Sequence, residues 1–163
     1  MRSFFPINGS AVLGLVALAF SLAGCTTPQG NGSVMITKVN PYHLSPGNYV
    51  SSEDPMIVHE YRSKLRGAID GDDYRDRYGY YFSVFWKSET RAPATVRLDY
   101  RLAKTGPRIH TLETDVGAPE KKNVTKFEVV GEEYAIDGTV TQWRVTILEG
   151  GVEVAEYKSF LWK

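Results

Sequence analysis

The stretch 70–78 stands out for its chemistry. It places four carboxylates within seven residues: Asp70, Asp72, Asp73 and Asp76. Clustered carboxylate oxygens are the ligands that Ca²⁺ prefers, and the first spacing fits the start of a calcium-binding loop. The pattern then breaks, because Tyr74 does not continue it and no Glu stands at the twelfth position. Two arginines in the stretch can neutralise the acids locally, so we expect a solvated connection between two strands and no metal site.

Aromatic residues lie within and just after the same stretch. Rings beside carboxylates and arginines can stack on sugar rings and hold their hydroxyl groups, which makes glycan binding an alternative interpretation. Alternation in the strand that follows predicts a buried Phe82, Val84 and Trp86 and leaves Tyr74, Tyr78 and Tyr81 exposed. The candidate binding surface consists of Asp70, Asp72, Asp73, Tyr74, Asp76 and Tyr78.

Other catalytic or cofactor-binding patterns are missing from the sequence. The chain has no Gly-x-Ser-x-Gly turn, no phosphate-binding glycine loop and no His-Glu-x-x-His motif. Its three histidines, His43, His59 and His110, have no metal-pair spacing. Lys plus Arg and Asp plus Glu each total 19, so charge gives no reason to expect nucleic acid. We therefore expect a non-catalytic protein without a cofactor.

The single cysteine, Cys25, follows a segment with the organisation of an export signal. Arg2 supplies a positive start, and residues 11–20 form an unbroken apolar run. This run is too short for a permanent transmembrane helix, which needs about 20 residues. One cysteine allows no intramolecular disulfide.

The residues before Cys25 resemble the lipobox of bacterial lipoproteins, Leu-[Ala/Ser]-[Gly/Ala]-Cys, at every position: Leu22, Ala23, Gly24 and Cys25. This resemblance implies transfer of diacylglycerol to the Cys25 sulfur, cleavage between Gly24 and Cys25 by signal peptidase II, and acylation of the new amino group. In bacterial lipoproteins, Asp directly after the lipobox Cys retains the protein at the inner membrane. Thr26 occupies this position, so the resemblance implies transport to the outer membrane. The acyl chains imply stable membrane anchoring.

The remaining chain must supply the elements that position these residues. Residues 25–33 are polar with Pro and Gly, which predicts a flexible tether. Residues 34–163 predict one domain of seven or eight strands without a helix. The expected strands are 34–39, 56–66, 80–87, 96–102, 109–116, 124–130, 140–148 and 152–162, with a loop over 40–55. Turns are expected at 104–107, at 137–138 and at the Gly150-Gly151 pair.

This pattern predicts an all-β domain with an antiparallel β-sandwich. Trp86 in a central strand resembles the core Trp of immunoglobulin-like and fibronectin type III folds, although the immunoglobulin disulfide is absent. A small β-barrel is the alternative architecture. The function expected from the sequence is a lipid-anchored envelope protein with a domain that binds an envelope protein or glycan. A structural envelope component is the alternative function.

Overall fold

The structure, a computed structural model, describes residues 29–30, 32–46 and 54–163. The predicted signal peptide, residues 1–24, and the predicted lipidation site, Cys25, lie outside these residues. The described chain contains eight strands and three helices. In order these are β1 (Gln29–Gly30), β2 (Val34–Leu44), α1 (Pro55–Lys64), α2 (Gly71–Arg77), β3 (Gly79–Ser88), β4 (Ala94–Leu102), β5 (His110–Val116), β6 (Lys122–Val130), α3 (Glu132–Asp137), β7 (Val140–Glu149) and β8 (Val152–Lys158).

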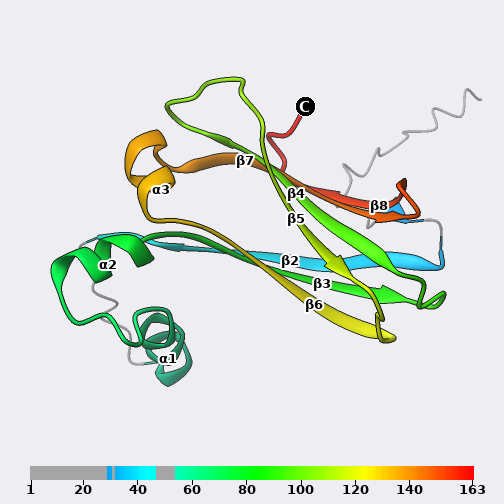
Figure 1. Ribbon diagram of the computed structural model, residues 1–163, viewed down its shortest axis with the longest axis horizontal. Helices are drawn as coiled ribbons and strands as arrows, with labels where there is room; N and C mark the ends of the chain where they lie inside the picture. The colour runs from blue at the N-terminus through cyan, green and yellow to red at the C-terminus, as the bar shows by residue number, and fades with distance from the viewer. Residues whose placement is uncertain (1–28, 31, 47–53) are drawn as a thin grey trace, which may run out of the picture.

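The strands form two separate antiparallel sheets (Figure 1). One sheet has the order β1-β8-β7-β4-β5, and the other has the order β2-β3-β6. They pack face to face as a β-sandwich, which confirms the predicted fold class and excludes the closed barrel.

The strand order is that of an immunoglobulin-like Greek key. The strands are counted here from β2, without β1. The first, second and fifth strands (β2, β3 and β6) then share one sheet, and the third, sixth and seventh (β4, β7 and β8) share the other. The fourth strand, β5, pairs with β4, whereas in the constant-type immunoglobulin domain the corresponding strand lies in the opposite sheet.

The core lies between the sheets and contains Trp86, as predicted. Trp86 is fully buried, and its indole Nε1–H donates a hydrogen bond to Thr125 Oγ1 at 3.1 Å. Phe82 and Val84 face the same interior from β3. A buried indole N–H needs a partner, and the pairing of β3 with β6 places Thr125 within reach of it.

Turn chemistry fixes the last hairpin. Gly150 and Gly151 have φ values of +59° and +82° and connect β7 to β8 as predicted. Glycine adopts these angles without the steric cost that a Cβ would bring.

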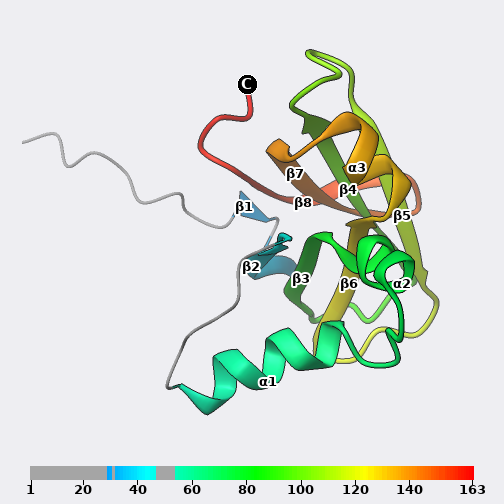
Figure 2. The ribbon, with the colours of Figure 1, turned by 90° about the vertical axis from the view of Figure 1, so that its left-hand side faces the viewer.

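The strand predicted over 56–66 is wrong, because this segment forms helix α1. The Asp54 side chain accepts a hydrogen bond from the Met56 N–H, and Pro55 occupies the first turn. Both features favour a helix start, since they satisfy or remove backbone donors that a helix leaves free. Figure 2 shows α1 lying below the three-stranded sheet as a separate layer.

Three other boundaries differ from prediction. Residues 40–44 belong to β2, where Pro41 is tolerated because β2 pairs only with β3. Residues 132–137 form α3, and Gly138 ends it. The last strand stops at Lys158, because the chain then turns.

The predicted tether 25–33 is also partly wrong. Gln29 and Gly30 form β1 and pair with Glu156 and Ala155 of β8. The backbone groups of an edge strand readily accept such a partner. Residues 25–28 and 31 lie outside the described part of the chain. None of the described helices is long and apolar enough to span a membrane.

Candidate functional site

The acidic stretch is the ordered helix α2 and its cap, and it connects α1 to β3, so the expectation of a connection between two strands is wrong. Asp70 caps the helix, and its Oδ1 accepts hydrogen bonds from the N–H groups of Asp72 and Asp73 at 3.0 and 2.9 Å. The Asp73 carboxylate accepts from the Ile69 N–H at 2.9 Å. Reciprocal bonds of this kind stabilise the start of a helix, so Asp70 and Asp73 hold the local structure.

Helix α2 is fastened to the three-stranded sheet at its C-terminal end. The Tyr81 hydroxyl donates to the Arg77 carbonyl oxygen at 2.7 Å, and the Gly131 N–H donates to the Tyr78 carbonyl at 3.2 Å. Burial raises the pKa of Tyr81 to about 12, with a further contribution from the nearby Glu128. Tyr81 is therefore buried, and the prediction that it is exposed is wrong.

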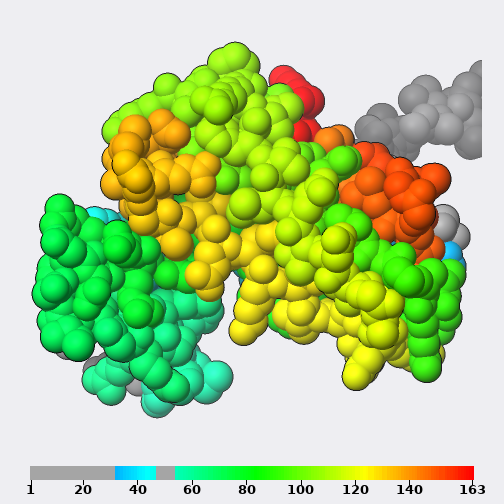
Figure 3. Space-filling model, viewed as in Figure 1, coloured from blue at the N-terminus to red at the C-terminus, as the bar shows by residue number. Residues whose placement is uncertain are grey.

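A shallow groove separates α2 from α3. Its cavity volume is about 360 Å³. The residues that line it are Asp72, Arg75, Asp76, Gly131, Glu132 and Ala135. Three carboxylates and one guanidinium make the groove acidic, and Arg75 pairs with Asp72. Figure 3 shows α2 and α3 side by side at one end of the molecule.

The four aspartates of the predicted site therefore separate into two groups, and the two tyrosines belong to neither. Asp72 and Asp76 line the groove, whereas the carboxylates of Asp70 and Asp73 cap α2. Tyr74 is partly exposed on α2, and Tyr78 is half-buried where α2 ends. Three groove residues come from outside the predicted stretch, namely Gly131, Glu132 and Ala135.

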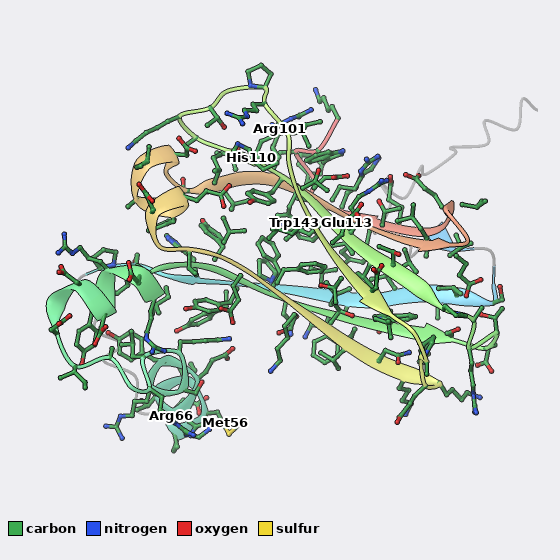
Figure 4. All side chains as sticks on the ribbon, in the orientation of Figure 1. Met56, Arg66, Arg101, His110, Glu113 and Trp143 are labelled. Atoms are coloured by element: carbon green, nitrogen blue, oxygen red, sulfur yellow. The ribbon has the colours of Figure 1, made fainter. Side chains whose placement is uncertain are left out.

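The other wall of the groove, α3, is held by two consecutive side chains that reach opposite sheets. Glu133 Oε1 accepts a hydrogen bond from the Tyr100 hydroxyl of β4 at 2.8 Å and lies 3.0 Å from His110 Nδ1 of β5. The Tyr134 hydroxyl lies 2.8 Å from His43 Nε2 of β2. We call these five side chains the α3 clamp. Figure 4 shows His110 on the upper side of the molecule, where the five-stranded sheet lies.

Burial shifts the pKa of two side chains of the clamp, Tyr100 and His43. It raises the pKa of Tyr100, and the hydrogen bond to Glu133 raises it further. It lowers the pKa of His43, whose ring stacks on Tyr80 with centroids 4.3 Å apart. Both groups are thus kept neutral near pH 7, which suits positioning of α3 by hydrogen bonds.

Two features of the sequence point to the clamp only in part. The spacing of the histidines indicates no metal pair and carries no information on their contacts with α3, and the pattern around α3 predicts only a turn at 137–138. Within residues 29–30, 32–46 and 54–163, no group of three or more His, Cys, Asp or Glu side chains could hold a metal ion.

Comparisons with known proteins give little beyond this geometry. No protein-family model matches the sequence, and no curated protein matches it. Among solved structures, a protein from Akkermansia muciniphila is similar, with 12% sequence identity and a TM-score of 0.43. The match covers 85% of this chain and 77% of the other. A likeness at this level carries no information on function.

Proposed function

We propose that this chain is an envelope lipoprotein, anchored through lipid on Cys25, whose sandwich is a non-catalytic interaction module. The observation that carries the anchoring is the sequence Leu22-Ala23-Gly24-Cys25 after a short apolar run. Residues 1–24 would be removed, and Thr26 favours the outer membrane. Lipid is a sufficient anchor for a chain with balanced charge, because each buried CH₂ contributes about 0.8 kcal/mol.

The groove between α2 and α3 is the surface proposed for a partner. Its walls are ordered, because α2 is capped and fastened to β3 and because the clamp fixes α3 to both sheets. Its acidic lining suits an envelope protein that presents basic side chains. A glycan is less favoured, because burial of Tyr81 removes one of the three rings available for stacking.

Anchoring is tested by metabolic labelling. Cells expressing the full chain are grown with labelled palmitate, and the N-terminal peptide is analysed by mass spectrometry. We expect label and a diacylglycerol-modified N-terminal Cys25, both lost in Cys25→Ala while the domain still folds. Label that persists in Cys25→Ala would refute the anchoring.

The interaction is tested by photo-crosslinking in intact cells. A photoreactive residue replaces Ala135 in the groove or, as the control, exposed Thr141 on β7. We expect a defined protein adduct from position 135 alone, and its loss when Asp76→Asn and Glu132→Gln reduce the groove charge. Equal adducts from both positions, a glycan adduct, or adducts only with copies of the same chain would contradict the proposal; the last would indicate a structural assembly unit.

A further inference from the structure

The C-terminal segment forms a fixed turn that displays two apolar side chains. Ser159 is held on β7, where its N–H donates to the Trp143 carbonyl at 2.9 Å and its Oγ accepts from the Trp143 N–H at 3.1 Å. The Trp162 N–H donates to the Ser159 carbonyl at 3.0 Å, which closes a turn. The two residues at the tip are Phe160, 91% exposed, and Leu161, 57% exposed.

Trp162 keeps this turn in place. Its ring is buried against the outer face of the five-stranded sheet, and the guanidinium carbons of Arg101 and Arg144 lie 4.7 and 5.4 Å from its centroid. Arg144 is itself held in place, because its Nη2 donates a hydrogen bond to Asp99 Oδ2 at 2.8 Å. The turn therefore holds two apolar side chains in contact with water. Their burial against a partner surface would remove this unfavourable contact.

The register of β1 limits how far the proposed lipid anchor can lie from the edge strand that leads into this turn. Gly30 pairs with Ala155 and Gln29 with Glu156, so β1 read toward the N-terminus follows β8 toward its C-terminal end. The Cys25 residue precedes Gln29 by four positions, and four residues span at most about 14 Å. Figure 2 shows β1 and the C-terminal tail on the same side of the molecule.

We propose that Phe160 and Leu161 insert into the surface of the lipid bilayer to which Cys25 is anchored, and so orient the domain on the membrane. This inference rests on the proposed lipid anchoring. An aromatic and an aliphatic side chain flanked by lysines are typical of segments that lie in the membrane interface. Lys158 and Lys163 flank the turn, and their charge complements anionic headgroups.

The test uses a polarity-sensitive dye on the mature lipidated protein. The lipid occupies the thiol of Cys25, so a cysteine introduced by Phe160→Cys is the only one available for labelling. The matched control is Ile69→Cys, because Ile69 is equally exposed, at 90%, and lies in the connection between α1 and α2, which Figure 2 shows diagonally opposite the C-terminal tail. Both proteins are placed in vesicles of phosphatidylethanolamine and phosphatidylglycerol.

We expect emission from position 160 to shift to shorter wavelength on vesicles and to be quenched by quenchers attached to acyl chains. Position 69 should show neither change. Equal behaviour at the two positions would overturn the proposal. A shift that appears without vesicles and grows with protein concentration would also overturn it, because a second copy would then cover the turn.

Mass spectrometry of the same samples separates this result from the fate of the lipid anchor. Protein that carries lipid on Cys25 but shows no shift at position 160 refutes the orientation and leaves the anchoring intact. Protein without lipid on Cys25 refutes the anchoring, and the orientation falls with it. The double variant Phe160→Ser with Leu161→Ser should keep the fold, since both side chains are exposed, and should make a dye on Lys163→Cys, an exposed position beside the turn, insensitive to vesicles.

Discussion

Removal of the Glu133 carboxylate should destabilise the domain far more than removal of its neighbour on α3. In Glu133→Ala, the buried Tyr100 hydroxyl loses its acceptor at 2.8 Å, and His110 loses the oxygen at 3.0 Å. In Glu132→Ala, a carboxylate at the groove surface is lost, and no hydrogen bond to it is observed among the described residues. The two variants share residue type, helix and first turn, so they form a matched pair.

The magnitude follows from the two contacts. A hydrogen bond to a charged acceptor contributes about 1.5–3 kcal/mol, because the orphaned buried donor keeps its desolvation cost. The Glu133 side chain is 35% exposed, so its pair with His110 is screened and contributes under about 1 kcal/mol. We expect Glu133→Ala to lower the free energy of unfolding by about 2–3 kcal/mol and Tm by roughly 7–11 °C for a domain of this size. For Glu132→Ala we expect a change within about 0.5 kcal/mol.

Urea unfolding followed by tryptophan fluorescence measures both variants, and a double-mutant cycle with Tyr100→Phe isolates the hydrogen bond. In the Tyr100→Phe background there is no buried hydroxyl to orphan, so Glu133→Ala should cost under about 1 kcal/mol. Equal destabilisation by the two glutamate variants, or an undiminished cost in the Tyr100→Phe background, would refute the clamp as the support of α3.

Three further predictions concern backbone fit and pH. Gly79→Ala should destabilise by about 3 kcal/mol or more, because its φ is +148° and a Cβ would clash with the Val129 carbonyl oxygen, whereas Gly71→Ala in open space at a helix start should cost nothing; urea unfolding compares them. The free energy of unfolding should fall from about pH 7.5 to 5.5, because burial lowers the pKa of His43 below its usual 6.5 and the unfolded chain binds the proton first; thermal melts of His43→Gln should show a smaller slope. Stability should also fall as the pH rises from 10 toward 12, because Tyr81 has a pKa of about 12 when folded and 10.0 when unfolded; an alkaline absorbance titration should show late-titrating phenols, Tyr100 among them, and one fewer in Tyr81→Phe.

Each of these has an outcome that contradicts it. Similar unfolding midpoints for the two glycine variants would show that the approach of β3 to β6 is not tight. An unchanged acid slope in His43→Gln would assign that slope to other groups, and a normal titration of Tyr81 would show that its ring is reached by solvent.

The strands could be predicted wherever one face of a segment is buried. The interior side of β3 carries Phe82, Val84 and Trp86, and the period of two is plain in the sequence. The same period misled at residues 57–65, where the apolar positions alternate although the segment is helical. Asp54 and Pro55 were the informative residues there, because a capping side chain followed by proline favours a helix start over a strand.

The candidate site could be predicted only in part, because most of it depends on pairing across the sequence. Asp72 and Asp76 were within the predicted surface, but Glu132 is more than fifty positions away and reaches the groove through the register of β3 with β6. The spacing of the aspartates also does not predict that the carboxylates of Asp70 and Asp73 accept hydrogen bonds from backbone N–H groups at the start of α2. In a stretch of four aspartates, those that cap a helix and those that face a surface groove cannot be distinguished from the sequence alone.

The pairing of β1 with β8 has a mechanical consequence. With Gln29 and Gly30 bound, the domain is held within about 14 Å of Cys25, whereas release of these two residues would transfer the first fixed point to Ser33, whose carbonyl oxygen accepts a hydrogen bond from the Glu89 N–H, and extend the reach to about 28 Å. Two residues of edge pairing contribute only about 1–3 kcal/mol, so a modest pull from a partner would detach them without unfolding the sandwich. Under the proposed anchoring, β1 would act as a short reserve of chain that lets the domain rise from the membrane under load and return when the load is released.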